Sequence, residues 1–330
     1  REDALKLYAM YTGLVYITPI FGGLLADKIL GFRNAVMLGA FLMTCGHVAM
    51  AFETEATFYL GLFLLIIGNG AFKPNISSIV GNLYPRSSDK KDAAYTIFYM
   101  GINAGAFLGI LLCGYIGEKV GWSYGFGLAG VFMFLGMLQF YFAQGIFGNI
   151  GISPRKKDHL EVSIQAGHMD VDEEKEEDVP SHVERDRLMV IGILAFFTIF
   201  FWMAFEQAGG SMTIFAKDYT NRLLTGGAAE TFRWFNTILT IAPLAIVTYV
   251  LLSLFNKTFK KYWLSNSFLG LSFVIIWIVA LGMIKNEFEQ EASEVPASWF
   301  GILNSFFIIA FAPLFSKVWE SKYNPSATVK

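Results

Sequence analysis

The sequence predicts an all-α membrane protein, built from helices that span the lipid bilayer. Of its 330 residues, 55% are hydrophobic and only 16% are charged, and the mean hydropathy is +0.49. A soluble domain with this balance would aggregate. Long apolar stretches recur along the chain, each at least close to the roughly 20 residues that cross a hydrocarbon core. Their number excludes a single membrane anchor.

Nine apolar segments are expected to form helices. Helices satisfy their own backbone groups where no water reaches. The segments are too long for the strands of a membrane barrel, which take about ten residues each. They are residues 5–27, 33–53, 57–84, 93–117, 122–147, 188–216, 232–256, 263–285 and 298–319.

The charges of the connections predict the orientation of these helices. Lysine and arginine gather in every second connection, as cytoplasmic loops do, and the intervening connections are poorer in cations or acidic. The first segment is therefore expected to run from outside to inside. Glu118 with Lys119, and Lys217 with Arg222, fit this pattern less well. The cytoplasmic cations are Lys28 and Arg33, then Arg86, Lys90 and Lys91, then residues 155–157 with Arg185 and Arg187, then Lys257, Lys260 and Lys261.

A polar stretch divides the chain into two groups of helices, residues 1–147 and 188–330. Residues 148–187 include the acidic run 170–178, and such like-charge blocks rarely fold. We expect a flexible cytoplasmic linker here, although an acidic metal-binding or partner-binding segment is an alternative. The chain opens without an initiator Met, so we also expect it to be a piece of a longer protein.

Neither the cysteines nor the net charge points to other chemistry. Cys45 and Cys113 lie inside apolar runs, where a thiol behaves as a small hydrophobe, so no disulfide or metal site is expected. The sequence has no nucleic-acid footprint. It also lacks a His-Glu-x-x-His pair, a nucleophile with its base and a phosphate loop, so we do not expect an enzyme.

Lys73 lies at the middle of the third segment, in Gly-Asn-Gly-Ala-Phe-Lys-Pro-Asn, residues 68–75, about ten residues from either end. A buried ammonium there costs several kcal/mol unless it meets water or an anion. We therefore expect a functional role, the alternative being an ion pair that holds two helices together. Pro74 removes a backbone hydrogen bond and loosens the helix beside the charge.

Two other segments carry polar groups at membrane depth. Gly101 and Gly105 are spaced for close helix packing, and the amide of Asn103 between them either packs or binds a ligand. In the sixth segment Trp202 precedes Glu206 by about one turn, so ring and acid share a face. Burial in an apolar cleft disfavours the charged form of a carboxylate, so Glu206 is expected to bind and release a proton. A helix-end carboxylate in contact with water is the alternative.

Three motifs in series resemble the proton-coupled oligopeptide transporter (POT/PTR) family of the major facilitator superfamily, in a bacterial form. They are Gly-Gly-Leu-Leu-Ala-Asp at residues 22–27, in the loop that runs on to Arg33, the Lys73 motif, and Phe-Tyr-x-x-Ile-Asn-x-Gly around Asn103. The resemblance implies a major facilitator bundle, with residues 1–147 as the family's helices two to six. Residues 188–330 would be helices seven and eight, with an inserted hairpin at about 232–285.

The resemblance also implies roles for single residues. Lys73 and Asn103 would bind the peptide carboxylate, and Tyr16 and Asn304 its backbone. Trp202 would line the pocket and Glu206 would be the proton switch. A buried Tyr16 with only a packing role is the alternative. Asp27, Arg33, Pro74, Gly101 and Gly105 are expected to serve structure and gating.

The sequence departs from the family at several places. The family's first helix, with its acid-x-x-acid-Arg motif, and its helices nine to twelve have no counterpart here and would be partners from the same protein. Ala9 occupies the position of a histidine in animal members, and His47 is expected to pack.

The function that follows is an import of di- and tripeptides, coupled to protons and to no other cofactor, across a bacterial plasma membrane. The import would proceed by alternating access, in which the binding site opens to one side of the membrane at a time. A major facilitator carrier of another small solute, such as nitrate or an organic anion, and a peptide sensor that does not transport are the alternatives.

Overall fold

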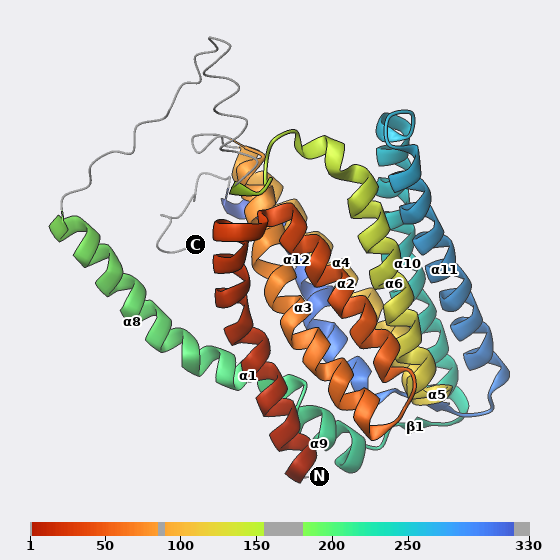
Figure 1. Cartoon of the computed structure of the whole chain (residues 1–330). Helices are drawn as coiled ribbons and strands as arrows, with labels where there is room; N and C mark the ends of the chain where they lie inside the picture. Colours follow the sequence, from red (N-terminus) through yellow and green to blue (C-terminus); the bar gives the residue numbers. More distant parts are fainter. Residues whose placement is uncertain (1, 85–89, 155–180, 320–330) are drawn as a thin grey trace.

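A computed structural model describes residues 2–84, 90–154 and 181–319, and in these ranges the chain is almost wholly helical (Figure 1). The helices are α1 Glu2–Leu25, α2 Phe32–Met50, α3 Glu55–Asn82, α4 Lys90–Gly109, α5 Tyr115–Lys119, α6 Trp122–Ala143, α8 Ser181–Phe205, α9 Ser211–Tyr219, α10 Gly226–Thr258, α11 Trp263–Glu289 and α12 Ile302–Trp319. Two π-helical turns, Ala26–Leu30 and Ile110–Gly114, extend α1 and join α4 to α5. The two-residue strands β1, Leu223–Leu224, and β2, Ser293–Glu294, pair antiparallel.

Each of the nine predicted segments overlaps one or more helices of the described part of the chain. Seven helical stretches there are long and apolar enough to cross a membrane. They are Glu2–Leu30, Glu55–Asn82, Ala94–Lys119, Trp122–Phe147, His182–Tyr219, Gly226–Thr258 and Trp263–Glu289. The second predicted segment, α2, is not among these seven stretches, and Ala297–Phe311 is a shorter apolar helix. The predicted hairpin corresponds to α10 and α11, while most of the predicted linker, residues 155–180, lies outside the described residues.

The sixth predicted segment is not one continuous helix. α8 ends at Phe205, a 3-10 turn covers Glu206–Ala208, and α9 begins only at Ser211. Gly209 and Gly210 lie at the break. The periodicity of the sequence does not reveal this break, because the apolar pattern runs on through it. As a consequence, Glu206 lies at the end of a helix rather than inside one.

The helices at the start of the chain approach each other through glycines. A β-carbon added to Gly22 in α1 would lie 2.0 Å from the carbonyl oxygen of Gly70 in α3. One added to Gly39 in α2 would lie 2.5 Å from the carbonyl oxygen of Gly68. Small residues allow such backbone contact between helices in membranes. By contrast, a β-carbon on Gly101 or Gly105 would meet nothing within 4 Å, so the close contact expected there is made with no described helix.

A hydrophobic core lies where α4 and α5 meet the α10–α11 hairpin and the start of α12. Its buried members are Phe107, Leu108, Leu111, Leu112, Tyr115, Leu244, Ala280, Met283, Trp299 and Ile302. α5, α9 and β1 lie at the end of the molecule that also holds the N-terminus, at the bottom of Figure 1. That end is the outside in the orientation predicted from the loop charges, so this core closes the outer end.

Candidate functional site

Tyr16 in α1 lies between the two charged residues that the sequence singled out. Its hydroxyl donates a hydrogen bond of 2.8 Å to Oε1 of Glu206. The ammonium nitrogen of Lys73 lies 4.9 Å from the centre of its ring. The ring of Trp202 is 5.8 Å from that of Tyr16, tilted by 45°. Four predicted site residues, from α1, α3 and the end of α8, therefore meet at one place.

Hydrogen bonds between α1 and α3 fix the register that brings Lys73 to Tyr16. The Thr18 hydroxyl donates to the carbonyl of Ile66 at 3.0 Å. The Asn69 amide donates to the carbonyl of Val15 at 3.2 Å, and the Asn75 amide to the carbonyl of Gly22, also at 3.2 Å. Such polar links between helices stabilise their packing in membranes. The Gly-Asn-Gly and Pro-Asn parts of the Lys73 motif thus position the lysine.

The structure shows no salt bridge of Lys73 with an acid of the described ranges, although one was the structural alternative. Its ammonium rests against the π face of Tyr16, an arrangement that attracts a cation by electrostatics. The Lys73 side chain is exposed. An exposed ammonium on a central helix, beside a carboxylate that it does not pair with, is available to an anionic ligand.

Glu206 is held by a second tyrosine, Tyr8, which the sequence analysis did not select. The Tyr8 hydroxyl lies 3.4 Å from both the backbone oxygen and Oε2 of Glu206. Tyr8 and Tyr16 thus contact different oxygens of one half-buried carboxylate. The helical spacing of two tyrosines in α1, together with the glycine pair that follows Glu206, was the signal that could have indicated this contact.

The two asparagines of the prediction lie in different surroundings. Asn103 is buried, 7% exposed, and its amide donates to the Tyr99 carbonyl of its own helix at 2.9 Å. This contact agrees with the packing alternative. Asn304 is exposed and lines a cavity of about 850 Å³ between α4 and α12.

This cavity also borders the helix that carries Lys73. Its walls are mostly aromatic and aliphatic side chains of α4 and α12, among them Tyr99, Ile102, Phe307 and Phe311. Ser77 of α3 reaches the same cavity, and its hydroxyl donates to the carbonyl of Lys73 at 3.2 Å. Asn304 and Ser77, which lies one turn after Lys73 in α3, therefore line one cavity, whereas Lys73 itself lies outside its lining.

Of the predicted structural residues, Asp27 and Arg33 lie away from this place, at the cytoplasmic end. Arg33 donates from Nε to the carbonyl of Ile150 at 2.6 Å and from Nη2 to that of Gly148, and its guanidinium lies over the Phe147 ring. Arg33 therefore ties the start of α2 to the segment after α6. Asp27 is exposed and lines a shallow hollow beside it, and Pro74 lies inside α3 next to Lys73.

Comparison with known proteins identifies the family of the chain. The sequence profile of the POT family (PTR2) matches residues 33–166. The peptide transporter YePEPT of Yersinia enterocolitica is 30% identical over 294 residues, which cover 72% of this chain and 56% of that protein. The chain belongs to the POT family. The di-/tripeptide transporter of Lactococcus lactis is 26% identical over all of this chain and 63% of its own length.

Solved structures of POT family members share the fold. A crystal structure of a mutant of the peptide transporter POT with sulfate matches with a TM-score of 0.51 and 28% identity, covering 96% of this chain and 59% of that one. A complex of the same kind of mutant with alafosfalin gives 0.52 and 26%, covering 98% and 60%. The chain spans between 56% and 63% of the length of the curated relatives that it matches. With its seven apolar helices, this POT protein is a multi-pass membrane protein.

Proposed function

We propose that this chain forms the larger part of a carrier that imports di- and tripeptides together with protons across a bacterial plasma membrane. One observation carries the proposal: Lys73, inside α3, and Glu206, at the end of α8, both contact Tyr16. Charged groups inside membrane segments mark substrate and proton pathways. The shared contact allows the state of one charge to act on the other.

Lys73 would bind the carboxylate of the peptide, because an ammonium without an acidic partner gains a charge-assisted hydrogen bond there. Asn304 would bind the peptide backbone from the cavity lined by α4 and α12, since an amide both donates and accepts. Trp202 would cover the pocket beside Tyr16. Asn103 would bind the peptide only after its hydrogen bond to the Tyr99 carbonyl is broken.

Glu206 would carry the coupled proton. When its carboxylate is charged, it accepts the hydrogen bond of Tyr16, and a charged acceptor makes such a bond stronger. Protonation removes that charge, weakens the hold of Glu206 on Tyr16 and changes the field at Lys73. A proton and a peptide bound together would thus shift the balance between two orientations of the helix groups around the central site.

The relatives support peptides as the substrate class, since they include a peptide transporter and a di-/tripeptide transporter. The crystal structure with alafosfalin is that of a peptide transporter as well. The remaining helices of a complete POT protein would act as partners of this chain and close the site. No cofactor other than the proton is proposed.

Uptake into proteoliposomes tests the proposal. The intact protein is reconstituted, an inward proton gradient is imposed, and accumulation of a labelled dipeptide is followed with and without an uncoupler. Unlabelled di- and tripeptides should compete, while nitrate and simple organic anions should not. Competition by nitrate alone would favour a carrier of another solute, and saturable binding without any flux would indicate a sensor.

A further inference from the structure

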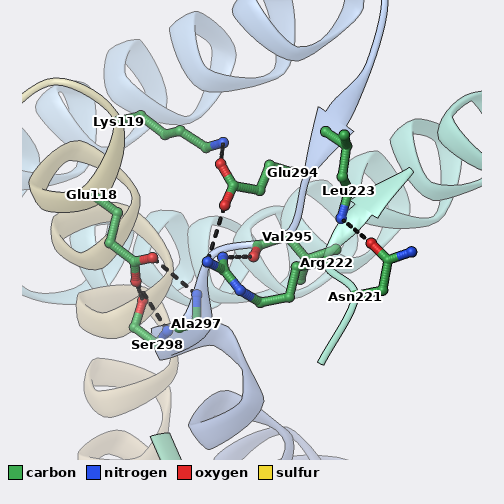
Figure 2. A network of polar contacts seen from close by, with 9 residues as sticks. All are labelled: Glu118, Lys119, Asn221, Arg222, Leu223, Glu294, Val295, Ala297 and Ser298. Carbon is green, nitrogen blue, oxygen red and sulfur yellow. Dashed lines mark hydrogen bonds and ion pairs between the residues drawn. The ribbon is translucent and has the colours of Figure 1, made fainter. Parts of the chain in front are cut away.

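The outer end of the molecule holds a polar network that joins the two groups of helices (Figure 2). Glu118, in α5, accepts hydrogen bonds from the backbone N–H groups of Ala297 and Ser298, each at 2.9 Å. Its Oε1 also accepts one from the Ser298 hydroxyl at 2.5 Å. Ala297 and Ser298 open the 3-10 turn that leads into α12. One carboxylate of the first group thus holds the start of a helix of the second.

An ion-pair bridge lies beside this contact. Glu294, in β2, is 3.4 Å from the Lys119 ammonium of α5 and 2.9 Å from the Arg222 guanidinium, which also donates to the Val295 carbonyl at 2.6 Å. The side chains of Lys119 and Arg222 are only 23% and 13% exposed. These are two of the cations that fitted the charge pattern of the loops poorly. The network explains their presence at the outer end.

Next to the network α4 and the start of α12 are in contact, and toward the cytoplasm a cavity lies between these two helices. At the outer end the Trp299 indole donates to the Leu111 carbonyl at 3.2 Å, and both residues are buried in the core there. Toward the cytoplasm, the same pair of helices, α4 and α12, encloses the cavity of about 850 Å³. Between α4 and the start of α12, the contact therefore lies at the side that holds Glu118, while α6 and α11 also meet nearer the cytoplasm, where the rings of Phe142 and Phe268 stack at 5.6 Å.

We propose that Glu118 and the Ala297–Ser298 turn form an outer latch, which keeps the carrier shut toward the outside and must release before the site can face outward. This proposal rests on the proposed function as a carrier. Releasing the latch leaves a carboxylate, two N–H groups and a hydroxyl without their partners until water enters. Each of these bonds exists in only one orientation of the groups, so the latch biases the equilibrium between them.

A disulfide across the latch tests whether its two sides separate during transport. A β-carbon on Gly114 would lie 3.4 Å from the Ser298 β-carbon, close to the separation of roughly 3.8 Å in disulfides. Gly114→Cys and Ser298→Cys are combined in the intact protein after Cys45 and Cys113 are changed to Ser. Oxidation should stop dipeptide uptake and a reductant should restore it, while each single variant stays active in oxidant. Full uptake by the cross-linked protein would overturn the proposal.

Labelling from the outside tests the latch without any substrate. Leu111, fully buried at the outer contact, is changed to Cys in the same cysteine-free background. Its reaction with a membrane-impermeant thiol reagent then reports outward opening. Glu118→Gln should speed labelling about tenfold, because charge-assisted hydrogen bonds that hold the closed state are lost.

Glu53→Gln is the matched control. Glu53 also accepts a backbone N–H at the outer end, from Ser123 at 2.7 Å, but both residues belong to the first group of helices. Equal labelling rates for the two variants, or no change with Glu118→Gln, would contradict a latch. Labelling needs neither peptide nor proton gradient, so a faster rate together with absent peptide uptake would refute the proposed substrate and leave the latch standing.

Discussion

Gly209 lies directly against Tyr8: a β-carbon on this glycine would be 2.2 Å from the Tyr8 hydroxyl oxygen. The same hydroxyl contacts the backbone oxygen and a carboxylate oxygen of Glu206. The break between α8 and α9 therefore creates the space that allows Tyr8 to approach the acid. A substitution at Gly209 should therefore change the surroundings of Glu206 through Tyr8, although Glu206 itself is unaltered.

We expect Gly209→Ala to reduce proton-driven peptide uptake strongly, because Tyr8 must move away and Glu206 loses one of its two phenol contacts. Counterflow exchange at fixed pH should suffer less. The matched control is Gly192→Ala in α8, where an added β-carbon would meet nothing within 4 Å. Similar uptake by both variants would show that the Tyr8 contact is unimportant.

Tyr16 makes two contacts, one with Glu206 and one with Lys73, and two substitutions distinguish their effects. Tyr16→Phe removes the hydrogen bond to Glu206 and keeps the ring beside Lys73, whereas Tyr16→Ala removes both. A hydrogen bond to a charged group contributes about 1.5–3 kcal/mol. We therefore expect Tyr16→Phe to shift the pH dependence of uptake with nearly unchanged peptide affinity, and Tyr16→Ala to weaken binding as well.

Tyr59→Phe serves as the reference for these measurements, since Tyr59 is an exposed tyrosine of α3 far along the helix from Lys73. Binding is measured by displacement of a labelled dipeptide and uptake as a function of outside pH. If the pH profile of Tyr16→Phe is the same as that of the unmodified protein, Tyr16 takes no part in proton coupling.

Lys73→Ala should abolish proton-driven uptake, because it removes the ammonium that would bind an anionic ligand among the apolar helices. Lys285→Ala, which removes an exposed lysine paired with Glu289 at 3.7 Å, should leave uptake unchanged. Uptake in proteoliposomes at several peptide concentrations makes the comparison. Full activity of Lys73→Ala would refute the role of this lysine.

Glu206→Gln should uncouple transport from the gradient and preserve exchange. The amide imitates a protonated carboxyl in shape but cannot change its charge. We expect counterflow of labelled peptide to continue while uphill accumulation under a proton gradient is lost. A Glu206→Gln protein that still concentrates peptide would assign the proton to another group.

The sequence predicted the helices and the central residues because their physical signals are local. Apolar length defines a span, and a lysine at mid-membrane is costly wherever the chain places it. The meeting of Lys73, Glu206 and Trp202 at Tyr16 was expected only through family resemblance. Its physical cause, the α1–α3 register set by Thr18 and Asn69, depends on contacts between distant segments.

Other features gave no local signal. The break after Glu206 lies in an apolar stretch in which two glycines also fit a helix, and the contact of Tyr8 with Gly209 there joins segments far apart in the sequence. The outer latch joins Glu118 to backbone groups of Ala297 and Ser298, and a backbone donor has no sequence signature. The glycines of the Asn103 motif fitted a packing pattern, yet no described helix lies against them.

The close contact of α1 with α3 leads to the last prediction, which concerns stability. Gly22 and Gly23 are neighbours in α1, but a β-carbon on Gly22 would lie 2.0 Å from the Gly70 oxygen, while one on Gly23 would meet nothing within 4 Å. Overpacking of this kind costs about 1–3 kcal/mol. We therefore expect Gly22→Ala to lower the melting temperature of the detergent-purified protein and to displace Lys73 from Tyr16, whereas Gly23→Ala should do neither. Thermal unfolding of the two variants side by side measures the difference in melting temperature. Equal melting temperatures would mean that α1 and α3 can move apart without loss of stability.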